Sequence, residues 1–208
     1  MDQKDGAVSR RYKHIFLDAE GTLYVPKHGR SRWEFWANPS PECAEEFFEL
    51  DEGVEDALRR LRKKAQTLGL VSWNSYPVLS ALLRKFKLGD YFDCILVNGD
   101  KGKRIESYLA RNGLKKDEAI MVGDMPKLDL YPLRKAGIDA ILVDRDYNWY
   151  VKAERIKGVN ELPDWLRIAD LADRIEKEEG RNATLDDFLG SGEHHQRQTK
   201  RLIAPAVS

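Results

Sequence analysis

The fold is decided by the stretch HIFLDAEGTL, residues 14–23, in which a short apolar run leads directly into two acidic residues. The run His14–Leu17 predicts a buried strand, and Gly21-Thr22 predicts the turn that follows it, with the Thr22 hydroxyl able to tie the turn. Asp18 therefore stands at the carboxyl end of a strand. Ligands of open α/β sheets bind at this end of the strands, so the stretch also indicates where to look for a site.

Four further apolar runs follow along the chain, and segments of helical periodicity separate them. The runs are Leu68–Ser72, Cys94–Val97, Ala119–Val122 and Ala140–Val143. We expect a helix before each run, over Val54–Ala65, Val78–Phe86, around Ile105–Leu109 and up to Gly137. This alternation predicts an α/β fold with a doubly wound, Rossmann-like parallel sheet, flanking helices and right-handed crossovers.

The length of 208 residues predicts one domain that carries an appendage. We expect an N-terminal arm over residues 1–12, a core over 13–150, a C-terminal helical extension over 151–190 and a flexible tail over 191–208. The connection 23–51 is unusually long and rich in aromatic residues, and such loops usually act as lids or binding loops. Its side chains Trp33, Phe35 and Trp36 are expected either to gate a site or to pack the loop onto the sheet edge.

The charge balance gives no reason to expect a nucleic-acid or membrane partner. Lys and Arg number 35, as do Asp and Glu, so the formal net charge is zero. No apolar run approaches the ~18 residues of a spanning helix, and the polar start Met1–Arg11 is unlike a signal peptide, so we expect a cytoplasmic protein. Cys43 and Cys94 lie far apart, which suggests neither a zinc site nor a disulfide framework.

Polar residues with a common chemistry follow the predicted strands, and the carboxyl ends of parallel strands share one edge of a sheet. They are Asp18 and Glu20 after the first strand, Ser72 at the end of the second, Lys101 after the third, and Asp124 and Asp129 after the fourth. Carboxylates suit Mg²⁺, which also takes phosphate oxygens as ligands. A carboxylate beside such a metal can attack phosphorus, so Asp18 is a candidate nucleophile that would form an aspartyl phosphate.

The other residues fit complementary roles around the same phosphorus. Ser72 and Lys101 can hold the phosphoryl oxygens, and Glu20 can protonate the leaving oxygen and later activate water. Further expected substrate-binding residues are Thr22, Trp73 and Asn74. Each residue also has an ordinary structural interpretation: a strand-end aspartate can cap a helix, and Lys101 or Lys103 can be a solvated lysine at a helix start.

Together these residues resemble the motifs of the haloacid dehalogenase superfamily, over Lys13 to Arg145. Asp18-Ala19-Glu20-Gly21-Thr22 is similar to Asp-x-Asp-Gly-Thr, and Gly123-Asp124 followed by Asp129 matches Gly-Asp-(x)₄-Asp. The strand ending in Ser72 and the following lysine, Lys101 rather than Lys103, complete the set. The resemblance implies a phosphatase that uses Mg²⁺, with the metal held by Asp18, Asp124, Asp129 and the backbone carbonyl of Glu20.

Within the superfamily the chain looks most like the magnesium-dependent phosphatases, capless or with only a small cap loop. This resemblance implies an open site, which favours a bulky or macromolecular phosphorylated substrate such as a phosphoprotein. A phosphorylated small molecule, including a sugar phosphate, is a further option. Glu20 departs from the usual second Asp, although enolase-phosphatases of the same superfamily carry Asp-x-Glu-Gly-Thr. The alternative hypothesis is a non-catalytic or weakly active Mg²⁺- and phosphoryl-binding interaction module of the same fold.

Overall fold

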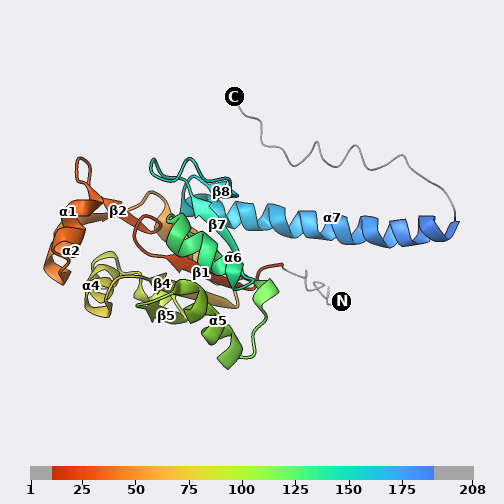
Figure 1. The fold of residues 1–208 in the computed structure, drawn as a ribbon, viewed down its shortest axis with the longest axis horizontal. Helices are drawn as coiled ribbons and strands as arrows, with labels where there is room; N and C mark the ends of the chain where they lie inside the picture. The colour runs from red at the N-terminus through yellow and green to blue at the C-terminus, as the bar shows by residue number, and fades with distance from the viewer. Residues whose placement is uncertain (1–10, 190–208) are drawn as a thin grey trace, which may run out of the picture. The chain divides into compact units, whose positions relative to one another are not determined.

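The computed structural model describes residues 11–189 and contains a six-stranded parallel sheet in the order β5-β4-β1-β6-β7-β8 (Figure 1). The strands are β1 (His14–Asp18), β4 (Thr67–Ser72), β5 (Cys94–Val97), β6 (Ala119–Gly123), β7 (Asp139–Val143) and β8 (Arg155–Ile156). The five predicted strands and the fold class are thus confirmed. The two-residue strand β8 was not predicted, because so short a segment has no periodicity of its own.

Successive residues of each strand face opposite sides of the sheet and join two separate hydrophobic clusters. In β1, Ile15 and Leu17 belong to one cluster and Phe16 belongs to the other. The first cluster includes residues of α3 (Val54–Lys64) and α4 (Tyr76–Phe86), and the second includes residues of α5 (Lys101–Arg111) and α6 (Tyr131–Lys135). The sheet is therefore covered on both faces, which explains why its strands read as continuous apolar runs.

Short helical turns connect these elements, and a longer helix follows the sheet. The turns are η1 (Gly89–Tyr91), η2 (Lys116–Glu118), η3 (Pro126–Leu130), which is π-helical, and η4 (Val159–Glu161), and the longer helix is α7 (Leu162–Leu189). Residues up to Asp170 form one compact unit, and a second unit begins at Leu171. Ile156, Val159 and Leu162, within the expected extension, contribute to the first hydrophobic cluster. The expected tail and most of the expected arm lie outside the described residues.

The connection 23–51 folds into a small subdomain rather than an irregular loop. It contains β2 (Tyr24–Pro26), α1 (Arg32–Ala37), α2 (Pro41–Phe47) and β3 (Phe48–Leu50), and β2 pairs with β3 in antiparallel register. We call residues 24–50 the flap. Phe35, Phe47 and Phe48 of the flap are almost fully buried, with ring centroids 4.9–5.8 Å apart. All three belong to the first hydrophobic cluster, and the rings of Tyr24 in the flap and Phe86 in α4, 6.0 Å apart, join the flap to the core.

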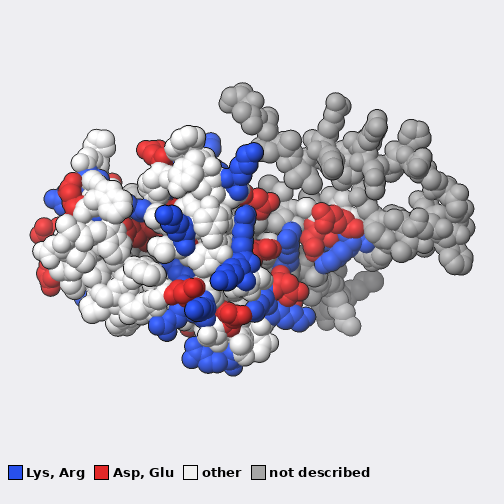
Figure 2. Space-filling model, viewed as in Figure 1, with Lys and Arg blue, Asp and Glu red and all other residues white. Residues whose placement is uncertain are grey.

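No helix within residues 11–189 is long and apolar enough to cross a membrane. On the face shown in Figure 2, charged side chains are denser over one part than over another. Figure 2 shows Lys, Arg, Asp and Glu interspersed over α5, whereas uncharged side chains predominate over α1, α2 and α4. The two helices of the flap therefore belong to the less charged part of this face.

Candidate active site

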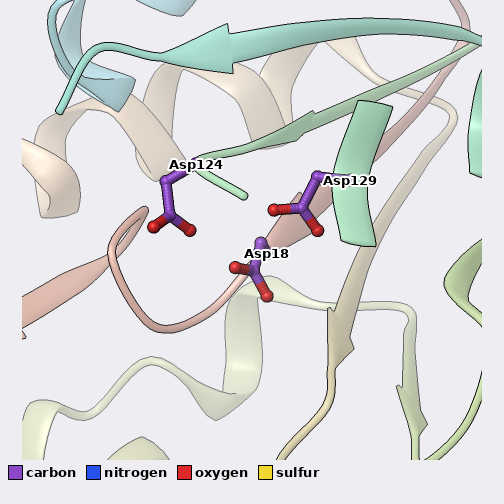
Figure 3. Close-up of side chains that lie close together, drawn as sticks. All are labelled: Asp18, Asp124 and Asp129. Carbon is purple, nitrogen blue, oxygen red and sulfur yellow. The ribbon is translucent and has the colours of Figure 1, made fainter. Parts of the chain in front are cut away.

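Three aspartates converge at the carboxyl ends of β1 and β6. Asp18 ends β1, Asp124 follows β6 directly, and Asp129 lies in the π-helical turn η3. All three are buried, and one carboxylate oxygen of each lies within 4.8 Å of the others. Figure 3 shows the three carboxylates gathered close together. Such a set of oxygen donors fits a hard divalent cation such as Mg²⁺.

Lys101 lies between two of these aspartates. It is the first residue of α5, and its Nζ lies 2.5 Å from Asp18 Oδ1 and 2.5 Å from Asp129 Oδ1. Lys103 is exposed, so Lys101 is the lysine that the structure brings into the site. Gly102 permits this placement, because a Cβ there would lie 2.6 Å from the carbonyl oxygen of Pro132 on α6.

The electrostatics of this cluster follow from its burial. Desolvation raises the pKa of Asp18 well above its ordinary value; the charge of Lys101 opposes this shift, and the neighbouring Asp129 adds to it. Desolvation also raises the pKa of Asp129, again against the charge of Lys101. For Lys101 itself burial lowers the pKa, but the carboxylates of Asp129 and Asp18 outweigh it, so the net shift is upward. The ammonium form of Lys101 is therefore the stable one in this cluster.

The two oxygens of Asp124 have different surroundings. Oδ2 accepts hydrogen bonds from Arg32 Nη2 at 3.1 Å and from the Tyr147 hydroxyl, whereas Oδ1 is buried and has no hydrogen-bond partner among the described residues. Burial and the charge of Asp124 raise the pKa of Tyr147, so its hydroxyl keeps the proton that it donates. The amide of Asn148 donates to the Asp124 carbonyl at 2.7 Å and holds the backbone. The orphaned Oδ1 is the atom that a metal ion would satisfy.

Gly21 explains how the first turn comes so close to Asp124. Its φ is +77°, and a Cβ at this position would lie 2.4 Å from Asp124 Oδ2. Only glycine combines this left-handed backbone with this approach. Gly21 of the first motif is thus needed for its backbone conformation, in the turn that the sequence predicted.

Glu20 lies beside the aspartates, and its carboxylate contacts the flap. Its Oε1 accepts a hydrogen bond from Trp36 Nε1 at 3.2 Å and lies 3.8 Å from Arg32 Nε, while Oε2 accepts from Asn74 Nδ2 at 3.5 Å. Burial raises the pKa of Glu20, and the charge of Arg32 opposes the shift. The Glu20 carboxylate is not part of the three-aspartate cluster. The contact of the Glu20 backbone carbonyl with a metal stays a prediction.

A cavity of about 230 Å³ opens beside Asp18 and Glu20. Its lining includes the predicted residues Asp18, Glu20, Ser72, Trp73, Asn74 and Lys101. Ser72 Oγ also accepts a hydrogen bond from the Asn74 backbone at 3.1 Å, which orders the loop after β4. Thr22 differs from the expectation: it is fully buried outside the lining, and its hydroxyl has no hydrogen-bond partner among the described residues. The hydroxyl therefore does not tie the turn as the sequence predicted, and the contact of Thr22 with substrate stays a prediction.

Sequence reasoning missed two residues that bind the site's carboxylates, Arg32 and Tyr147. Arg32 begins α1, and a capping box formed by Ser31 and Glu34 fixes this helix start. That Ser-x-x-Glu signal predicts where the helix begins, and the spacing from Arg32 to Trp36 places both on one helix face. Tyr147 follows β7 at the same edge of the sheet, a position that the rule of strand ends could have identified.

This fold and this edge of acidic residues define a hydrolase of the haloacid dehalogenase type. A family profile described as haloacid dehalogenase-like hydrolase matches residues 23–143, more than half of the chain, and the chain belongs to this family. The matched segment holds Ser72, Lys101, Asp124 and Asp129 and begins after Asp18.

A phosphoglycolate phosphatase from Synechococcus elongatus is 29% identical over 121 residues, which are 57% of this chain and 54% of that protein. The match thus spans about half the length of this curated relative. Among solved structures, a phosphatase of the family from Thermococcus onnurineus has a TM-score of 0.60 at 20% identity, over 74% of this chain and 97% of that one.

A putative hydrolase of the family from Bacillus subtilis, solved bound to magnesium, has a TM-score of 0.61 at 15% identity, over 76% of this chain and 99% of that one. Another relative, from Rhodobacter sphaeroides and in complex with phosphate, has a TM-score of 0.56 at 15% identity, over 73% and 96%. At these identities the structures establish the shared fold.

Proposed function

We propose that the protein is a Mg²⁺-dependent phosphatase that hydrolyses a phosphomonoester through an aspartyl phosphate on Asp18. The observation that carries this proposal is the buried cluster of Asp18, Asp124 and Asp129, with Lys101 between two of them and one oxygen of Asp124 left unpartnered. The relatives named as phosphatases and the relatives solved with magnesium or phosphate support it.

Asp18, Asp124 and Asp129 would hold the metal ion. The donor set is entirely carboxylate oxygen, and the unpartnered Asp124 Oδ1 fits a cation directly. A bound Mg²⁺ would neutralise charge on the phosphoryl oxygens, so that an anionic nucleophile can approach phosphorus. Tyr147 and Arg32 hold the other oxygen of Asp124 and so orient it.

In the first step Asp18 would attack phosphorus. A new bond forms from an Asp18 carboxylate oxygen to phosphorus while the bond from phosphorus to the leaving oxygen breaks. Glu20, as the carboxylic acid, gives its proton to the leaving oxygen, and the alcohol departs. Lys101 and Ser72 hold the phosphoryl oxygens during transfer, because both line the cavity beside Asp18.

In the second step water would hydrolyse the aspartyl phosphate. Glu20, now a carboxylate, takes a proton from water, and the water oxygen attacks phosphorus. The bond from phosphorus to Asp18 breaks, which releases inorganic phosphate and restores both carboxyl groups. The contacts of Glu20 with Trp36 and Asn74 orient its carboxylate for both proton transfers.

Hydrolysis of p-nitrophenyl phosphate tests the proposal, measured with Mg²⁺ and with EDTA. We expect activity only with Mg²⁺ and a loss of at least about 10³-fold in Asp18→Asn, since nucleophile removal abolishes the covalent route. Asp117→Asn, an exposed aspartate in η2, is the matched control and should keep full activity.

Two outcomes would contradict the proposal, one for the nucleophile and one for the phosphatase activity. Unchanged turnover in Asp18→Asn would exclude this residue as nucleophile. Binding of beryllium fluoride with Mg²⁺ but without steady-state phosphate release from any phosphomonoester would favour the alternative, a phosphoryl-binding interaction module.

A further inference from the structure

Three tryptophans surround the cavity in which the phosphoryl group would bind. Trp33 and Trp36 come from α1 of the flap, and Trp73 directly follows Ser72 in the loop after β4. Their exposed fractions are 73%, 36% and 48%, respectively. Single exposed aromatic residues are ordinary, but three around one opening form an apolar rim above a charged floor.

The rim leaves aromatic faces available to a ligand. Trp36 is held in place, since its Nε1 donates to Glu20 and its ring packs edge-on against Phe35 at 5.6 Å. Trp33 and Trp73, in contrast, make no ring contact with another aromatic side chain within residues 11–189. Two indole rings from different elements thus border the cavity without an aromatic partner.

The size of the cavity limits what it can accept. Its volume of about 230 Å³ is below the ~300–1,000 Å³ typical of pockets that bury a drug-sized ligand. The floor around Asp18 and Lys101 would take the phosphoryl group. The rest of the lining includes the three tryptophans together with Met125 and Leu128, so it is mostly apolar.

Both cations that line the cavity already have carboxylate partners. Arg32 pairs with Asp124 and Glu20, and Lys101 pairs with Asp18 and Asp129. The part of the rim formed by the tryptophans therefore offers a substrate aromatic surface rather than charge.

We propose, on the basis of the phosphatase function above, that the substrate is a phosphomonoester whose alcohol carries a planar aromatic ring. Trp33 and Trp73 stack against this ring and Trp36 forms the wall of the pocket. A planar aromatic ring can stack face to face on an indole, whereas a puckered saturated ring of the same size cannot. This substrate class differs from phosphoglycolate, the compound in the name of the Synechococcus relative.

Benzyl phosphate and cyclohexylmethyl phosphate test the proposal as a matched pair. The leaving alcohols are of similar size and acidity, because neither ring is conjugated with the oxygen. We expect kcat/KM of the Mg²⁺-loaded enzyme to be about tenfold higher for benzyl phosphate, the effect of one stacking contact. Trp33→Ala and Trp73→Ala should bring this ratio close to one, and Trp149→Ala, an exposed tryptophan outside the lining, should leave it unchanged.

The failure of this inference is distinct from failure of the phosphatase. Equal kcat/KM for both esters, with phosphate released from each, would overturn the aromatic substrate class and leave the phosphatase intact. If neither ester is hydrolysed, calorimetric binding to the Asp18→Asn protein decides the matter: tighter binding of benzyl phosphate, lost in Trp73→Ala, supports the inference, and equal affinities overturn it.

Discussion

Replacement of Lys101 by methionine removes the amino group that ion-pairs with two buried carboxylates. Its Nζ lies 2.5 Å from both Asp18 and Asp129, and the three side chains are 2%, 7% and 0% exposed. Methionine keeps most of the length of the side chain, so the change removes charge and hydrogen bonds more than volume. The substitution therefore isolates the electrostatic contribution of Lys101.

The expected cost is about 3–5 kcal/mol in the free energy of unfolding without metal, because loss of one partner leaves buried charge uncompensated. An exposed pair gives the contrast: Arg59 and Glu55 lie 3.2 Å apart with side chains 53% and 61% exposed. Such pairs contribute about 0.2–1 kcal/mol. Arg59→Met is thus the matched control, with an expected cost below about 1 kcal/mol.

Urea unfolding followed by circular dichroism, in EDTA and in Mg²⁺, measures both variants against the wild type. We expect Mg²⁺ to recover part of the loss in Lys101→Met, since a divalent cation supplies the missing positive charge, and to stabilise Arg59→Met by the same amount as the wild type, because the metal site of that variant is intact. A loss of less than about 1 kcal/mol in Lys101→Met without metal would refute the reasoning. It would mean that the carboxylates do not depend on Lys101 for compensation.

Three further perturbations test the site and the core. Tyr147→Phe should weaken Mg²⁺ binding at least about tenfold by calorimetry, because the hydroxyl orients Asp124; unchanged affinity would remove that role. Gly21→Ala should abolish Mg²⁺ binding, since its Cβ would lie 2.4 Å from Asp124 Oδ2, whereas Gly29→Ala, with similar positive φ and open space, should only cost about 1 kcal/mol in unfolding. Burial lowers the pKa of His14 below 6.5, so the unfolded chain binds more protons as pH falls. The contribution of His14 to stability should therefore fall from pH 7.5 to pH 5.5, so in urea titrations over this range the wild type should lose stability relative to His14→Gln; an unchanged difference between the two proteins would contradict this.

The sheet could be predicted from sequence because its strands are buried on both faces. A run such as Ala119–Val122 is apolar throughout, and the order of runs and helices leaves few topologies. The same rule placed Asp18 and Lys101 at one edge although 83 residues separate them. Parallel strands bring their carboxyl ends together whatever the length of the connections.

The flap could not be predicted in the same way, because its structure depends on contacts between residues distant in sequence. Phe35 and Phe48 bury each other only once β2 pairs with β3 and α1 packs beside them. The three-residue strands carry too little periodicity to be detected. For this reason the contacts of Arg32 with Asp124 and Glu20 became visible only in the structure, and the two roles expected for the loop aromatics are divided between Phe35, which packs, and Trp36, which contacts Glu20.

Helix α1 separates the anchoring side chain from the one that borders the cavity within little more than half a turn. Phe35 is fully buried among the flap aromatics, while Trp33, two residues earlier, is mostly exposed and borders the cavity. A change at Trp33 therefore alters what the cavity contacts without disturbing the side chain that holds the helix. In evolutionary terms, the specificity of this site can drift through substitutions at the rim that cost the fold little stability, while the aspartates beneath remain fixed by their chemistry.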